Sequence, residues 1–122
     1  MGKTILIVDN DRAVRSMASF TLSLESCVVF EAFDVLEAVQ RLQEGIRPEL
    51  IIAGADIAGV DFCEFIIHIR SLPQCRFAPV IVLADERLLD RRMEWKEAGA
   101  ACWIVKPFTA EQLLEVVGLL DS

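Results

Sequence analysis

Short apolar runs alternate with stretches of helical periodicity along the whole chain. The runs lie at 4–8, 27–30, 50–53, 80–83 and 102–105. Both alternating sets of positions in them are apolar, which is typical of parallel strands covered on both faces. Between the runs, apolar residues recur three and four positions apart, as on one face of a helix. This pattern predicts five βα units in one open parallel sheet with helices on both faces.

Capping signals mark where three of the predicted helices begin. Asp34, Asp61 and Thr109 each precede a Glu or Gln by three positions, which is the spacing of a capping box. The fourth helix is predicted over 88–98 and is more polar than the others. We therefore expect Trp95, which lies on it, to be half exposed.

Composition and charge exclude several classes of protein. Apolar residues make up 54% of the 122-residue chain, above the usual share of about 45–50%, which argues against disorder. The chain has 12 Lys and Arg against 19 Asp and Glu, a net charge of −7. This balance argues against direct binding to nucleic acid or to an anionic membrane surface. No linker or repeat is visible, so residues 1–122 are interpreted as a single domain.

The cysteines and the apolar runs indicate in which cellular compartment the protein is expected. No two of the four cysteines have C-x-x-C spacing, which argues against a zinc site. Cys27, Cys63 and Cys102 lie in apolar runs, and we expect them to be buried small residues in a reducing environment. The runs are too short to span a membrane, and no signal-peptide pattern is visible. We therefore expect a cytoplasmic protein.

Functional side chains are expected where the strands end, because ligands of open parallel sheets bind at the carboxyl ends of the strands. Carboxylates and a lysine that meet there suit a hard cation or a phosphoryl group. Taken singly, each has an ordinary structural explanation, such as helix capping by Asp11. The polar and small residues that follow the runs include Asp9, Asn10, Asp11, Gly54, Asp56, Ala84, Asp85, Lys106 and Pro107.

Five segments of the chain resemble the receiver domain of two-component response regulators. They are ILIVD at 5–9, PELII at 48–52, APVIVL at 78–83, AGA at 98–100 and KPF at 106–108. The resemblance covers nearly the whole chain. It implies an α/β, flavodoxin-like, doubly wound sheet of (βα)5 topology with strand order 2-1-3-4-5. It also implies a part in phosphorelay signal transduction rather than enzymatic catalysis.

The resemblance implies a phosphorylation site, and this chain departs from its pattern. In the family, an acidic pair after the first strand helps to bind Mg²⁺, and an Asp ending the third strand accepts the phosphoryl group. A Ser or Thr ending the fourth strand and a Lys before Pro bind that group. Here Asp9 and Lys106–Pro107 match the pattern, but Asn10 replaces the second acid. Gly54 stands at the acceptor position and Ala84 at the hydroxyl position.

These replacements predict a pseudo-receiver that works without phosphorylation. Gly54 has no carboxylate to attack phosphorus, and Asn10 offers a metal only a neutral oxygen. We expect no catalytic residue and no cofactor, with Asp9, Asn10 and Asp56 as weak Mg²⁺ ligands at most. Asp9 and Lys106 are expected to pair directly. The vestigial pocket is predicted to comprise Asp9, Asn10, Gly54, Asp56, Ala84, Trp103, Lys106 and Pro107.

Two alternatives stay open at this point. Asp56, two residues after Gly54, could serve as a displaced acceptor in a Mg²⁺-dependent receiver, although it lies roughly 6–7 Å further along an extended chain. Alternatively, a small ligand could fill the space left near Gly54 and Ala84.

A pseudo-receiver would act through protein contacts. The resemblance implies a contact face formed by the fourth helix, the fifth strand and the fifth helix. Its partner would be a histidine kinase, an effector domain or another regulator, or a second copy in a homodimer. Trp103 stands at the family's switch aromatic and is expected to be a packed core or interface residue. Basic residues over 87–96 could belong to the interface or simply be solvated.

Overall fold

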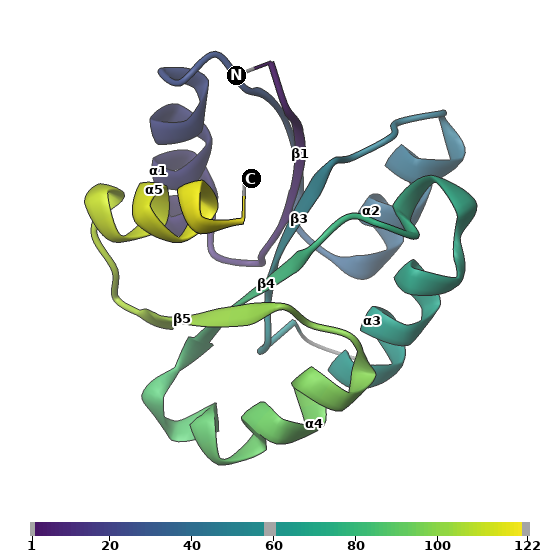
Figure 1. Cartoon of the computed structure of the whole chain (residues 1–122), viewed down its shortest axis with the longest axis vertical. Helices are drawn as coiled ribbons and strands as arrows, with labels where there is room; N and C mark the ends of the chain where they lie inside the picture. Colours follow the sequence, from purple (N-terminus) through teal and green to yellow (C-terminus); the bar gives the residue numbers. More distant parts are fainter. Residues whose placement is uncertain (1, 58–60, 121–122) are drawn as a thin grey trace.

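A computed structural model describes residues 2–57 and 61–120 (Figure 1). The strands are β1 (Thr4–Val8), β2 (Val28–Ala32), β3 (Leu50–Gly54), β4 (Val80–Asp85) and β5 (Cys102–Lys106). The α-helices are α1 (Arg12–Ser23), α2 (Val35–Gln43), α3 (Phe62–Ser71), α4 (Arg92–Ala98) and α5 (Ala110–Leu119). Two 3₁₀ helices are η1 (Pro73–Cys75) and η2 (Glu86–Arg91).

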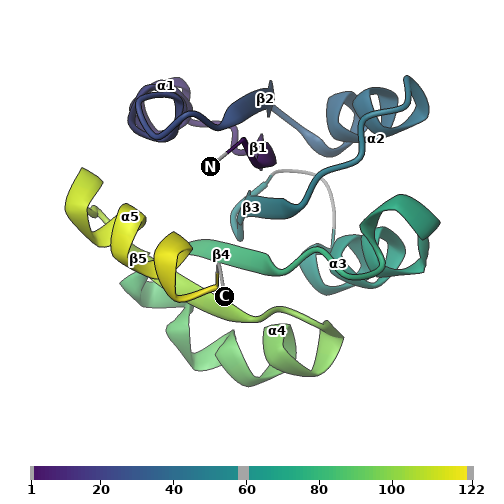
Figure 2. The ribbon, with the colours of Figure 1, turned by 45° about the horizontal axis from the view of Figure 1, so that its top comes forward.

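The strands form one parallel sheet in the order β2-β1-β3-β4-β5. Helices α1 and α5 cover one face, and α2, α3 and α4 cover the other (Figures 1 and 2). This confirms the predicted flavodoxin-like fold and strand order. Because all strands run the same way, their carboxyl ends meet at one edge of the sheet.

Two apolar cores, one on each face of the sheet, hold the layers together. Leu6 and Val8 of β1 are buried against the core beneath α2, α3 and α4. Ile5 and Ile7 of the same strand are buried in the core beneath α1 and α5. Each buried aliphatic side chain contributes about 1.5–3 kcal/mol relative to exposure. The double covering explains why β1 is apolar at successive positions.

The predicted capping signals lie at helix starts, although only one is a complete capping box. Around Thr109, the hydroxyl accepts from the Gln112 N–H and the Gln112 side chain accepts from the Thr109 N–H. Asp34 and Asp61 accept first-turn N–H groups of α2 and α3. Asp11 does the same for α1, which begins directly after the β1 end.

The fourth helical segment differs from its prediction over 88–98. Its first part belongs to η2, and the regular helix α4 begins only at Arg92, without a side-chain cap. Trp95 is 2% exposed, so the expectation of a half-exposed indole is wrong. The reason is that α4 packs against α3. The indole of Trp95 meets Phe62 and Trp103 edge-on, each with ring centroids 6.3 Å apart.

The cysteines also differ from expectation. Cys75 is buried, whereas Cys27, Cys63 and Cys102 are only partly buried, because they lie at the margins of the apolar cores. All four are free thiols. Within the described residues, no helix is both long and apolar enough to cross a membrane.

Candidate functional site

The carboxyl edge of the sheet brings Asp9, Asp56 and Lys106 together from three different segments. Val8 pairs with Ala53 across the β1–β3 ladder, so Asp9 follows β1 directly beside Gly54 at the end of β3. Lys106, the last residue of β5, reaches both carboxylates. The charged groups expected at this edge therefore do converge.

Asp9 is a fully buried carboxylate, with no exposed surface. Its Oδ1 accepts a hydrogen bond from the backbone N–H of Asp11 at 2.8 Å. Its Oδ2 lies 2.9 Å from Nζ of Lys106 as an ion pair, and no N–H of the described residues donates to this atom in hydrogen-bond geometry. The expected direct pairing of Asp9 with Lys106 is confirmed. A buried charge is tolerable only with such a partner.

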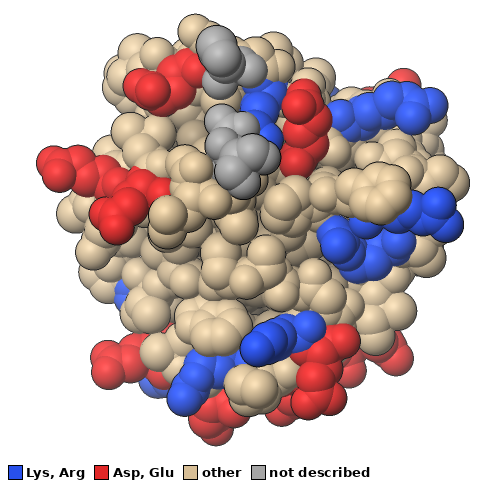
Figure 3. Space-filling view, in the orientation of Figure 1, with Lys and Arg blue, Asp and Glu red and all other residues tan. Residues whose placement is uncertain are grey.

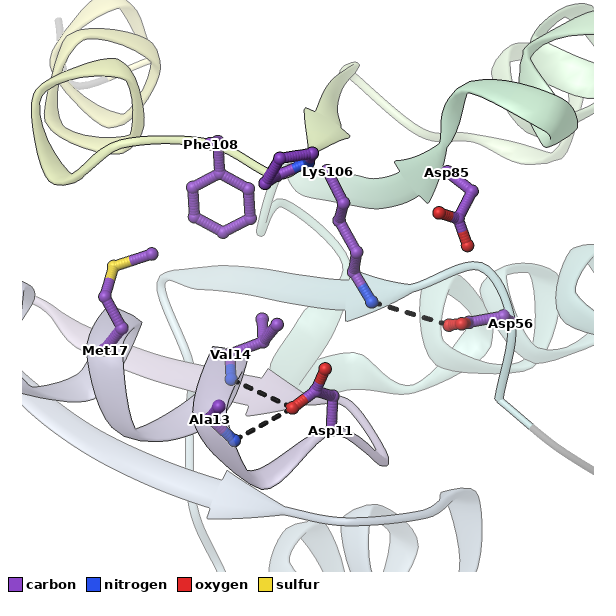
Figure 4. Close-up of a pocket in the computed structure, with 9 residues that line it drawn as sticks. Asp11, Ala13, Val14, Met17, Asp56, Asp85, Lys106 and Phe108 are labelled. Atoms are coloured by element: carbon purple, nitrogen blue, oxygen red, sulfur yellow. Dashed lines mark hydrogen bonds and ion pairs between the residues drawn. The ribbon is translucent and has the colours of Figure 1, made fainter.

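Lys106 has a second acidic neighbour in Asp56, whose Oδ1 lies 3.6 Å from Nζ (Figure 4). The lysine side chain is 13% exposed, whereas that of Asp56 is 41% exposed and open to solvent. Burial acts to lower the pKa of Lys106. The close ion-pair contact with Asp9, with the charges of Asp56 and Asp11, outweighs burial, so the pKa of Lys106 lies above the usual lysine value. The ammonium is therefore firmly charged near neutral pH.

With Asp9 in its present position, a side chain at residue 54 could be added only if Asp9 shifted. A Cβ added to Gly54 would overlap Oδ2 of Asp9 and lie 2.9 Å from Cγ of that residue. It would also lie 3.3 Å from Oδ1 of Asp56. Two carboxylates from neighbouring segments thus border the volume that a side chain of residue 54 would enter.

Arg15 belongs to this edge and was not predicted. Its Nη1 donates to the backbone carbonyl of Asp9 at 2.6 Å, and its Nε lies 3.4 Å from Oε1 of Glu31 on β2. One guanidinium on α1 therefore ties together the ends of β1 and β2. Its place one helical turn after Asp11 is the only sequence signal, and that signal does not distinguish it from Arg12, at the start of the same helix.

An open pocket of about 420 Å³ lies beside the ion pair, between the start of α1 and the segment that joins β5 to α5 (Figure 4). Neither Gly54 nor Ala84 lines it. Ala84 is 1% exposed within β4, and Asp9 crowds Gly54, so the space expected there is filled. The lining residues are Asp11, Ala13, Val14, Met17, Asp56, Asp85, Lys106, Pro107 and Phe108.

The remaining predicted residues lie around this centre. Asn10 is exposed in the turn after β1, and Pro107 joins Lys106 in lining the pocket. Trp103 is partly buried in β5 and contacts Trp95. Within residues 2–57 and 61–120, no three His, Cys, Asp or Glu side chains are grouped so that they could hold a metal ion.

Comparison with known proteins identifies the family. Residues 5–118 match the model of the response regulator receiver domain. The phosphate regulon transcriptional regulatory protein PhoB of Escherichia coli (strain K12) is 31% identical over 114 residues, which are 93% of this chain and 49% of that protein. Response regulator MprA of Mycobacterium ulcerans (strain Agy99) is 32% identical over 114 residues, 93% of this chain and 48% of that protein.

A solved structure agrees with these sequence matches. Chemotaxis response regulator CheY4 of Vibrio cholerae superposes with a TM-score of 0.90 at 31% identity, over 98% of this chain and 99% of that one. The chain spans about half the length of the two regulators compared by sequence. By its fold, its strand-end lysine and these matches, the chain belongs to the response regulator receiver domain family of two-component signalling.

Proposed function

We propose that this receiver domain is a pseudo-receiver, which signals by protein contact and does not depend on phosphorylation. The observation that carries the proposal is the packing around Gly54, which stands where the family's phosphoacceptor is expected. Acyl phosphate formation requires a carboxylate nucleophile, and glycine supplies none. The volume that such a side chain would need is bordered by Asp9 and Asp56 instead.

The metal that the family uses fits this donor set poorly. Mg²⁺ prefers several anionic oxygens in near-octahedral geometry. Of the carboxylate oxygens of Asp9, one accepts the Asp11 N–H and the other faces Lys106. Asn10 contributes only a neutral amide. We therefore propose that the domain does not use Mg²⁺ and has no enzymatic activity.

The face formed by α4, β5 and α5 is the proposed contact surface. Met93 on α4 is 55% exposed and Val105 on β5 is 38% exposed. A hollow of about 370 Å³ is lined by residues of β5 and α5, including Trp103, Val105 and Val116. Acidic and basic side chains lie next to one another over α4, at the bottom of Figure 3. Exposed apolar side chains together with charges of both signs suit a protein partner better than a nucleic acid.

The partner is proposed to be a histidine kinase, an effector domain, another regulator or a second copy of the chain. The pseudo-receiver proposal is tested by measuring intact mass after incubation with acetyl phosphate and Mg²⁺. A receiver domain with Asp at the acceptor position serves as the positive control. The expected result is no added phosphoryl group on this chain. A stoichiometric gain would overturn the proposal.

A second candidate function rests on Asp56. Its Oδ1 lies 3.6 Å from Lys106 and 3.3 Å from the point where a Cβ of residue 54 would be. The carboxylate thus reaches back toward the acceptor position, as a displaced nucleophile would. In the same mass experiment, a phosphoryl gain that Asp56→Asn abolishes would establish this alternative. A gain that survives Asp56→Asn would exclude it.

A further inference from the structure

We propose that Asp9 replaces the missing acceptor carboxylate as the permanent counter-ion of Lys106, and that this ion pair excludes any side chain at residue 54. The inference rests on the proposed function, since it concerns the same vestigial pocket. It goes further because it explains which group balances the charge of Lys106 and why residue 54 is a glycine. Gly54 is then a requirement of the Asp9–Lys106 pair as well as the loss of an acceptor.

The geometry supports mutual exclusion at the level of single atoms. The Asp9 atom that a residue-54 Cβ would overlap is Oδ2, the same atom that faces Nζ of Lys106 at 2.9 Å. The added Cβ would also press on Cγ of Asp9 at 2.9 Å, closer than carbon atoms normally approach. A shift of the carboxylate large enough to admit a Cβ must therefore move the atom that makes the ion pair.

Asp9 has little freedom to move aside. Its side chain has no exposed surface, and its other oxygen is fixed by the Asp11 N–H. Its backbone carbonyl is held by Arg15. Rotating the carboxylate away from Gly54 would break the ion pair and the hydrogen bond together, inside a region from which water is largely excluded.

A second glycine provides a matched control. Gly118 lies on the exposed side of α5, and a Cβ added there would meet nothing within 4 Å. The substitution Gly118→Ala therefore introduces the same methyl group without a clash. Any loss specific to Gly54→Ala then reports the packing at the site.

The test is a set of thermal unfolding measurements on the whole chain. Gly54→Ala is made in the unmodified chain, in Asp9→Ala and in Lys106→Met. We expect Gly54→Ala to lower Tm by about 5 °C in the unmodified chain, where it overpacks the site. In Asp9→Ala and in Lys106→Met it should lower Tm by much less, because the carboxylate is absent or released. Equal losses in all backgrounds, or no loss in the unmodified chain, would overturn the inference.

Amine labelling supplies a readout that does not depend on stability. Lys106 should react with acetic anhydride more slowly than the exposed Lys96 in the unmodified chain, and faster after Gly54→Ala breaks its pair. Unchanged protection of Lys106 in folded Gly54→Ala would contradict mutual exclusion. Phosphorylation of the unmodified chain would instead overturn the proposed function, so the two failures are read from different experiments.

Discussion

The strand-end site and the α4–β5–α5 face use their side chains in opposite ways. At the strand ends, Asp9 has no exposed surface and pairs with Lys106, which is only partly buried. On the α4–β5–α5 face, Met93 and Val105 leave apolar surface open to solvent. Charged pairs away from the strand ends are solvent-exposed, as for Arg91 and Glu94 at the start of α4, which lie 2.8 Å apart with more than half of each side chain exposed.

This difference supports the proposal that the domain acts by recognition and not by phosphorylation chemistry. When the carboxylate and the ammonium of a site are paired with each other, neither is readily available to bind a metal or a phosphoryl group. A face with exposed apolar side chains still gains free energy when a partner covers it. The comparison therefore favours a domain that keeps the family's contact surface and gives up its reactive centre.

The largest effect should come from breaking the Asp9–Lys106 pair. Lys106→Met keeps much of the side-chain volume but leaves Asp9 without its counter-charge. We expect the free energy of unfolding to fall by about 3 kcal/mol, as when a buried charge loses its partner. Urea denaturation at pH 7 measures this. The matched Lys96→Met, at an exposed position, should change it by less than about 0.5 kcal/mol. Similar losses for both variants would show that the pair is not special.

Alkaline pH should produce part of the same loss. The pKa of Lys106 is raised in the folded chain, chiefly by Asp9 acting against the effect of burial. The stabilisation is therefore fully present below the pKa of an unfolded lysine, about 10.4, and is lost as pH rises through the higher folded pKa. Urea midpoints between pH 8 and pH 11.5 should fall more steeply for the unmodified chain than for Lys106→Met. If the urea midpoints of the two chains fell in parallel with pH, Lys106 would not be the cause of the alkaline loss of stability.

Helix α5 should tolerate an added methyl group that the strand-end site does not. Gly118→Ala adds a methyl group in open space on α5. We expect it to raise the free energy of unfolding by up to about 1 kcal/mol, because alanine favours a helix over glycine. Urea denaturation beside Gly54→Ala provides the check. A loss of stability from Gly118→Ala would mean that α5 is more closely packed than its exposure indicates.

The smallest change in stability is expected from Val105→Glu. This residue is 38% exposed on β5, so the substitution should alter the free energy of unfolding by less than about 0.5 kcal/mol. It should nevertheless weaken partner binding or self-association, because it replaces an exposed apolar side chain of the α4–β5–α5 face with a charged one. Sedimentation velocity across a concentration series tests the homodimer. Identical association of Val105→Glu and a dimeric unmodified chain would exclude this face as the dimer interface.

The fold could be predicted from the sequence because strands that are buried on both faces are apolar at every position, and these apolar runs are visible in the sequence. The pairing of Asp9 with Lys106 was also predictable, since few charges remain once Gly54 and Asn10 replace acids. The burial of Trp95 was not predictable, because its sequence neighbours are mostly polar and do not indicate that one side of α4 packs on α3.

Two features of the site depend on contacts that sequence spacing does not encode. The sequence argument assumed that the chain continues in an extended conformation from Gly54 to Asp56. In the structure the chain turns directly after Gly54, so the Asp56 carboxylate lies close to Lys106. Arg15 reaches two strand ends from α1, and nothing in its local sequence indicates which way a long side chain extends. Such tertiary contacts had to come from the structure.

The most direct test of the self-paired site is an NMR comparison of the chain before and after addition of Mg²⁺ with acetyl phosphate. The signals to follow are the indole N–H of Trp103 and the backbone amides of Gly54 and Lys106. We predict that these signals stay in place, because Lys106 is already paired with Asp9. Shifts that spread from the end of β3 to β5, and that Asp56→Asn abolishes, would contradict it and show that the domain is still a phosphorylation switch.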